Sequence, residues 1–94
     1  MLRLIGYNGT MHYVYILRSE KSTDRFYIGY TENLDRRLFE HLNAPSDAYT
    51  RRYAPWKLET YVVFKDKKLA VEFEAYLKSH SGRAFLRRRL MAAE

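Results

Sequence analysis

Arg37 and His41 are residues whose types and spacing can support chemistry. They lie four positions apart in a segment with helical periodicity, so their side chains share one side of the predicted helix. An arginine presents a planar fork of donors that matches two oxygens of a phosphate. A histidine with an ordinary pKa of about 6.5 can accept or donate a proton near neutral pH. The pair indicates binding of an anionic group beside a group that can move a proton.

Three other side chains add chemistry that fits this pair. Tyr15 and Tyr27 supply hydroxyls from two aromatic-rich segments, and Glu74 supplies a carboxylate, the oxygen ligand that Mg²⁺ or Mn²⁺ prefers. Each residue alone has an ordinary explanation. The tyrosines suit half-buried strands, Arg37 a solvated helix face, His41 a helix C-terminus and Glu74 a surface ion pair. Their joint occurrence is what favours a site.

The elements that must position these residues begin with three predicted strands. Residues 12–18, 26–31 and 56–64 are dense in β-branched and aromatic residues. The first has no alternation of polar and apolar residues, so we expect it to be covered on both faces. A short polar connection over residues 19–25 predicts that the first two strands form a hairpin. Gly29 marks either a bulge or the close approach of another group, and both explanations stay open here.

The first predicted helix begins after an N-cap at Asn33 and runs to about residue 43. Leu34, Leu38 and Leu42 share its apolar face, and Arg36 points toward solvent. Residues 44–55 contain two prolines and a basic-aromatic stretch, so we expect them to be irregular.

Two further helices are predicted toward the C-terminus. Asp66 caps a helix over residues 67–79, whose apolar stripe is made of Leu69, Ala70, Phe73, Tyr76 and Leu77. Ser81 and Gly82 are expected to end it, and a short basic helix is expected over residues 83–92. The order ββαβαα predicts an α/β fold: a small three-stranded antiparallel sheet flanked by helices.

Length and composition limit the protein class. The chain has 94 residues and 11.3 kDa, enough for one small domain, which we place at residues 12–94 after an N-terminal arm of residues 1–11. Met11 is an alternative start to Met1. No cysteine is present, which excludes disulfides, thiolate chemistry and Cys-ligated metals. Apolar runs fall far short of the ~18 residues that span a bilayer, so we expect a cytoplasmic protein without membrane association.

The charge balance points to a polyanionic partner. Lys and Arg number 17 against 11 Asp and Glu, which gives a net charge of +6 and a pI near 9.7. Many small soluble proteins are equally basic, so charge alone does not decide the matter. Several cations are expected to track a phosphate backbone, and they are Arg51, Arg52, Lys57, Lys78, Arg87 and Arg88.

The order of these motifs resembles the GIY-YIG nuclease superfamily. The matching features are Tyr13-Val14-Tyr15, Tyr27-Ile28-Gly29, the segment 33–38, His41, and Ala70 with Glu74 and Lys78. The resemblance covers nearly all of residues 12–90. It is closest to small single-domain bacterial members related to the N-terminal nuclease domain of excinuclease C.

The resemblance implies a catalytic set. Members cleave a phosphodiester with one divalent metal, so Glu74 is expected to hold Mg²⁺ or Mn²⁺ and Arg37 to bind the scissile phosphate. Tyr15 and Tyr27 would surround the nucleophilic water beside His41. A tyrosine has an ordinary pKa of about 10 and is an awkward base. Either nearby cations favour a phenolate, or a tyrosine orients water while His41 moves the proton.

Two departures from the family pattern bear on this set. Tyr13 stands where the motif name has glycine, and Tyr30 follows Gly29 where some members carry a lysine that helps activate the nucleophile. The second departure leaves the identity of the base open.

The expected function is therefore a metal-dependent endonuclease acting on DNA, with DNA repair or recombination as its setting. No second domain is expected, so a protein partner is one candidate source of targeting. The main alternative is a non-catalytic nucleic-acid-binding module with a vestigial site. A third is a protein-binding domain whose basic face meets an acidic partner.

Overall fold

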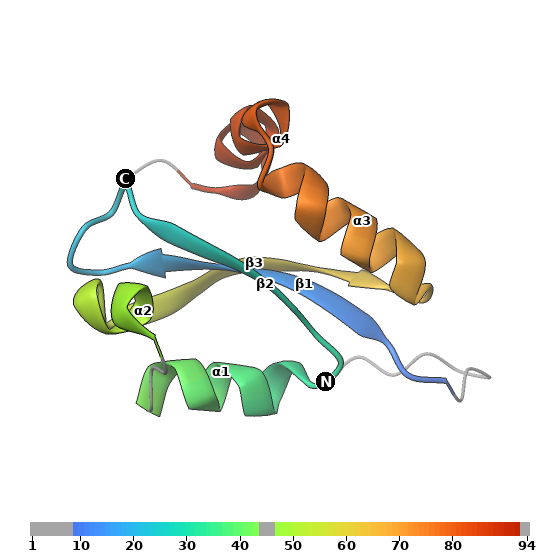
Figure 1. The fold of residues 1–94 in the computed structure, drawn as a ribbon, viewed down its shortest axis with the longest axis horizontal. Helices are drawn as coiled ribbons and strands as arrows, with labels where there is room; N and C mark the ends of the chain where they lie inside the picture. The colour runs from blue at the N-terminus through green and yellow to red at the C-terminus, as the bar shows by residue number, and fades with distance from the viewer. Residues whose placement is uncertain (1–8, 44–46, 93–94) are drawn as a thin grey trace.

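The fold is built on a three-stranded antiparallel sheet with the strand order β2-β1-β3. The computed structural model describes residues 9–43 and 47–92. The strands are β1 (His12–Ser19), β2 (Phe26–Thr31) and β3 (Trp56–Phe64), and β1 pairs with both neighbours (Figure 1). The predicted strands and the hairpin between the first two are confirmed. β2 and β3 are the edges of the sheet.

Helices cover both faces of this sheet. One face carries α1 (Leu34–Asn43) and α2 (Ala48–Arg52). The other carries α3 (Lys67–Leu77), α4 (His80–Phe85) and the π-helical turn η1 (Leu86–Leu90), as Figure 1 shows for the labelled helices. The predicted α/β class with a small antiparallel sheet is confirmed. In the described parts of the chain, no helix is both long enough and apolar enough to cross a bilayer.

The strand β1 supplies the centre of two cores. Its even-numbered residues Val14 and Ile16 pack with Ala70, Leu77 and Leu86 under α3, α4 and η1. Its odd-numbered residues Tyr15 and Leu17 pack with Trp56 on the side of α1 and α2. Because successive strand residues point to opposite faces, a strand packed on both sides must be apolar throughout. This confirms that β1 is covered on both faces.

Two helix boundaries differ from the sequence predictions. Residues 44–55 were predicted to be irregular, but α2 forms within them because the Asp47 side chain and Thr50 make a reciprocal capping box. The third predicted helix was placed after Gly82, but α4 begins at His80 because the Ser79 hydroxyl accepts from the amide of Gly82 at 3.1 Å. α3 accordingly ends at Leu77.

Gly82 serves packing and does not end a helix. A Cβ at this position would overlap the backbone carbonyl of Tyr76. The absence of a side chain therefore lets α4 pack closely against the end of α3. The residues 1–8 of the predicted N-terminal arm and residues 44–46 lie outside the described parts of the chain.

A buried ion pair holds the last described residues. Arg18 and Glu59 come from adjacent strands, with 3.2 Å between Arg18 Nε and Glu59 Oε1. An Arg18 Nη2 hydrogen is donated to the carbonyl of Ala92 at 2.7 Å, and the Ala92 amide donates to Glu59 Oε2 at 2.9 Å. The pair therefore fixes where the chain runs after η1.

Candidate active site at the β2 edge

Tyr15 extends across the neighbouring strand β2. It is the cross-strand partner of Gly29, and a Cβ at residue 29 would overlap the outer end of the Tyr15 ring. Of the two explanations for Gly29, the structure supports close approach, because the side chain that fills the space above it is Tyr15. The Tyr15 hydroxyl therefore lies over β2, an edge strand, in a residue that is only 1% exposed.

The Tyr15 hydroxyl is the meeting point of the predicted site residues. It lies 2.9 Å from His41 Nε2 and accepts a hydrogen bond from Arg37 Nε at 3.3 Å. The Tyr27 ring stacks on Tyr15, with 6.3 Å between centroids, and meets His41 edge-on at 4.7 Å. Side chains from β1, β2 and α1 therefore form one cluster, which contains four of the five predicted catalytic residues.

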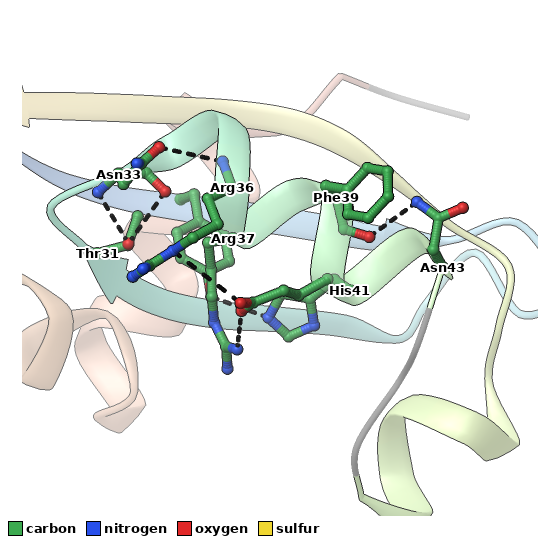
Figure 2. A network of polar contacts seen from close by, with 9 residues as sticks. Thr31, Asn33, Arg36, Arg37, Phe39, His41 and Asn43 are labelled. Carbon is green, nitrogen blue, oxygen red and sulfur yellow. Dashed lines mark hydrogen bonds and ion pairs between the residues drawn. The ribbon is translucent and has the colours of Figure 1, made fainter.

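The start of α1 sets the direction of Arg37 and His41. The Thr31 hydroxyl accepts from the amide of Asn33 at 3.1 Å, and Asn33 Oδ1 accepts from the amide of Arg36 at 3.1 Å (Figure 2). This N-cap fixes the first turn of the helix, as the sequence predicted. Arg37 and His41 then follow one turn apart, and Arg36 is exposed to solvent. The apolar face is shorter than predicted, because Leu42 is 51% exposed at the end of the helix.

Burial controls the protonation of the cluster. Desolvation raises the pKa of Tyr15 to about 12, against a smaller opposing effect of its hydrogen bond with Arg37. Desolvation also lowers the pKa of His41, and the charge of Arg37 adds to this. At neutral pH the phenol is protonated and the imidazole is neutral. The Tyr15 hydroxyl accepts from Arg37 and has one proton of its own to donate, which His41 Nε2 accepts when the neutral imidazole carries its proton on Nδ1.

Arg37 is held in place by a residue that the sequence analysis did not include. Glu40 accepts a hydrogen bond from Arg37 Nη1 at 2.9 Å, and this contact is the main cause of the raised Arg37 pKa. The i, i+3 spacing of Arg37 and Glu40 on the predicted helix was the sequence signal for this contact. The guanidinium retains other N–H groups, which remain able to donate to an anion.

Glu74 approaches the cluster from α3 on the other side of the sheet. Its negative charge contributes to the raised pKa of Tyr15, which places the carboxylate within electrostatic range of that hydroxyl. Glu74 Oε2 forms an ion pair with Lys78 Nζ at 3.0 Å. Within residues 9–43 and 47–92, no three His, Asp or Glu side chains gather as metal ligands. Mg²⁺ often binds through one carboxylate and several waters, so the oxygen donors present here fit that ion.

A family model, described as the GIY-YIG catalytic domain, matches residues 11–88. The chain belongs to the GIY-YIG family. The match includes both strands of the site, α1 and α3, and therefore every residue of the cluster. The GIY-YIG family is a family of nuclease catalytic domains, which gives the chain an endonuclease-type function and a nucleic-acid substrate.

Relatives of this GIY-YIG domain have similar length. UPF0213 protein CPE1444 of Clostridium perfringens is 38% identical over 68 residues, which cover 72% of this chain and 71% of the relative. UPF0213 protein NP_0776A of Natronomonas pharaonis is 39% identical over 70 residues, covering 74% and 80%.

A solved structure extends this similarity to the fold. The solution NMR structure of UPF0213 protein BH0048 from Bacillus halodurans has a TM-score of 0.51 and 32% identity, with 83% of each chain covered. It supports the three-stranded antiparallel sheet and flanking helices of this GIY-YIG domain.

The cations predicted to bind nucleic acid are dispersed over the GIY-YIG domain. Lys78 lies beside Glu74, and the others are exposed on α2, at the start of β3 and on η1. The structure does not gather Arg51, Arg52, Lys57, Arg87 and Arg88 into the cluster around Tyr15. Arg52 instead lies over the ring of Tyr53 at 5.4 Å. Their binding to nucleic acid stays a prediction.

Proposed function

We propose that this GIY-YIG domain is a divalent-metal-dependent endonuclease that hydrolyses phosphodiester bonds in DNA, in repair or recombination. The observation that carries the proposal is the convergence of Arg37 and His41 on the Tyr15 hydroxyl over the edge strand β2. Phosphodiester hydrolysis needs a group that binds the anionic phosphate, one that orients water and one that takes a proton. The cluster holds one residue suited to each task.

Arg37 is the residue that binds the scissile phosphate in this proposal. Its hydrogen bonds to Glu40 and Tyr15 fix the guanidinium before substrate arrives. A fixed donor does not have to reorganise when charge develops on the phosphoryl oxygens, which is how such groups lower a barrier.

Tyr15 orients the nucleophilic water, and His41 accepts its proton. A phenol with a pKa of about 12 remains protonated, so it serves through hydrogen bonds, with Tyr27 packed against it. The lowered pKa keeps His41 neutral, so Nε2 can take the Tyr15 hydroxyl proton while that hydroxyl takes a proton from the water. Both shifts support the second of the two sequence-based alternatives, in which the histidine moves the proton.

Glu74 would hold the divalent metal, Mg²⁺ or Mn²⁺. When bound, the metal polarises the phosphoryl group and stabilises the leaving oxygen. Lys78 forms an ion pair with Glu74, so a bound metal would compete with it for the carboxylate and would leave the Lys78 ammonium able to contact a phosphate. The Glu74 side chain is 22% exposed.

The test compares wild-type protein with Glu74→Ala and with Glu72→Ala, an exposed carboxylate on the same helix. Labelled single-stranded, duplex and branched DNA are incubated with Mg²⁺, Mn²⁺ or EDTA. We expect metal-dependent cleavage by wild type and Glu72→Ala, and a loss of at least about a hundredfold in Glu74→Ala. Equal cleavage by Glu74→Ala would remove Glu74 from the site, and no cleavage under any condition would refute the proposal.

A non-catalytic DNA-binding module is the second candidate. The satisfied ion pair between Glu74 and Lys78 and the net charge of +6 favour it. It predicts salt-dependent DNA binding that does not respond to Mg²⁺ and is never followed by cleavage.

A further inference from the structure

Two arginines pack on the residue that begins β2. Arg83 on α4 and Arg87 on η1 each place the guanidinium carbon 5.5 Å from the centroid of the Phe26 ring. Arg25, the preceding residue, lies over the ring of Tyr53 at 5.1 Å. Such stacking uses the flat face of a guanidinium and leaves its N–H donors free at the edge. Arg83 also donates from Nε to the carbonyl of Lys78 at 3.4 Å, and the other donors of the three arginines are available.

The three charges act on the same region of the molecule from both faces of the sheet. Arg25 and Arg87 both help to lower the pKa of Asp24, after its hydrogen bonds to Ser22 and to backbone. Arg25 and Arg83 both oppose the effect of burial on the pKa of Tyr49. In the part of the chain that the structure describes, the ion pairs within 4 Å involve other cations.

This arginine group lies beside the catalytic cluster. Tyr27 directly follows Phe26, and successive residues of a strand point to opposite faces. Phe26 thus faces α4 and η1, whereas Tyr27 faces the cluster on the side of α1. Phe26 and Gly29 are separated by three residues of β2, about 10 Å. The axial rise of a duplex is about 3.4 Å per nucleotide and successive phosphates of one strand are farther apart than this rise, so about 10 Å spans fewer than about three nucleotides.

The surface next to Arg87 is hollowed. Arg18, Arg87 and Arg88 line an open pocket of about 530 Å³ together with Phe26 and Met91, and one carboxylate, that of Asp24, also lines it. A sugar-phosphate backbone can therefore approach Arg87 without displacing the packed side chains. Because β2 is an edge strand, the same backbone can be contacted from both faces of the sheet.

We propose that Arg25, Arg83 and Arg87 form a second phosphate-binding subsite, fewer than about three nucleotides from the scissile phosphate. The DNA backbone then lies along the β2 edge and is held by Arg37 from one face and by Arg83 and Arg87 from the other. The inference rests on the proposed function in taking DNA as the ligand. It assigns roles to Arg25 and Arg83, which had none, and places Arg87 relative to the cleaved bond.

The experiment measures binding of wild-type protein to a short labelled duplex in EDTA, which prevents cleavage. Fluorescence anisotropy gives the affinity between about 50 and 200 mM salt. We expect the double variant Arg83→Ala, Arg87→Ala to lower the slope of log affinity against log salt by about 1.8, since each lost phosphate contact removes about 0.9. The matched control is Lys67→Ala, Lys68→Ala, which removes two charges at the opposite end of α3 and should leave the slope nearly unchanged.

Several outcomes would overturn the subsite. The subsite is refuted if the arginine variant binds with the affinity and slope of wild type. It is also refuted if the lysine variant loses as much slope as the arginine variant, because the location of the lost charges would then not matter. Should thermal unfolding reveal a misfolded double variant, Arg25→Ala, whose residue is exposed, is expected to lower the slope by about 0.9. An unchanged slope in Arg25→Ala would also refute the proposal.

Cleavage separates this inference from the proposed function. If wild type cleaves DNA and the arginine variant binds DNA normally, the subsite is refuted and the proposed function is kept. Salt-dependent binding through Arg83 and Arg87 without any cleavage refutes the nuclease and keeps the subsite. Absence of DNA binding by wild type refutes both. A duplex that ends at the cut on one side should bring wild type and the arginine variant to equal affinity, for one of the two sides only.

Discussion

The two faces of the sheet are built from the same strands but bury different kinds of side chain. Under α3, α4 and η1, Val14 and Ile16 meet aliphatic residues, and the packing is almost wholly apolar. Under α1, the corresponding central residue is Tyr15, whose hydroxyl is buried with His41 and Arg37. One face therefore supplies stability through burial of apolar area, and the other buries polar groups that must satisfy one another.

The helices over both faces expose some large apolar side chains. Phe39 on α1 is 67% exposed and Leu69 on α3 is 52% exposed, whereas Tyr15 on the second face and Leu77 on the first are almost fully buried. A face that buries polar groups in its centre removes less apolar area from water there. Substitutions on the first face should therefore act on folding and those on the second on chemistry. The expected effect on unfolding decreases from the apolar core to the polar cluster.

Leu77→Ala should strongly destabilise the protein, because it opens a cavity on the apolar face. We expect a loss of about 2 to 5 kcal/mol in the free energy of unfolding, measured by urea denaturation. Leu69→Ala on the same helix is the matched control, since Leu69 is 52% exposed and should change stability by about 0.5 kcal/mol or less. Similar losses in the two variants would break the distinction between the faces.

Gly29→Ala should affect both folding and chemistry, because the added Cβ overlaps the ring of Tyr15. We expect a loss of about 1 to 3 kcal/mol in the free energy of unfolding, together with reduced cleavage. In a Tyr15→Ala background the overlap is gone, so the further cost of Gly29→Ala should largely disappear in a double-mutant cycle. Additive effects would contradict the close approach.

Tyr15→Phe should separate chemistry from stability most clearly. Loss of the hydroxyl removes the contacts to His41 and Arg37 while the ring keeps its packing, so unfolding should change by about 1.5 kcal/mol or less. Cleavage should fall about a hundredfold or more. Tyr61→Phe, at an exposed position on β3, is the control and should retain activity. Full activity of Tyr15→Phe would place the chemistry elsewhere.

The pH dependence of stability should carry a small contribution from His41. Burial lowers its pKa in the folded protein, so the unfolded chain binds more protons. Its stabilising contribution is complete above the ordinary pKa of about 6.5 and is lost as pH falls toward the folded pKa.

The test compares the free energy of unfolding at about pH 7.5 and pH 5 for wild type, His41→Gln and the control His80→Gln. Wild type and His80→Gln should lose more stability on acidification than His41→Gln. An equal loss in all three would contradict the shift.

Local signals account for what the sequence predicted of the fold. The three strands and the caps at Asn33 and Asp66 follow from short-range composition, so they were placed correctly. The capping box of Asp47 and Thr50 was obscured by two neighbouring prolines, and Ser79 by a glycine that was taken as a helix end. The exposure of Leu42 depends on how far α1 overlies the sheet, which periodicity does not encode.

The residues of the candidate site also divide into those that local signals placed and those that tertiary contacts bring together. Helical spacing alone put Arg37 and His41 on one side of α1. Their contact with Tyr15 required the space above Gly29, which is a tertiary feature, and the sequence offered that close approach only as one of two explanations. Arg25 and Arg83 were missed because segments far apart in sequence bring them together around Phe26 and Tyr53. The catalytic roles themselves stay predictions until cleavage is measured.

The buried pair of Arg18 and Glu59 has a consequence for how this protein diverges. It binds the carbonyl and the amide of residue 92 and never its side chain, so any residue except proline can occupy that position. The spacing between η1 and residue 92 is a different matter, because one inserted or deleted residue would present the wrong amide. Over evolutionary time, position 92 should therefore tolerate substitutions, whereas the segment between η1 and residue 92 should not tolerate insertions or deletions.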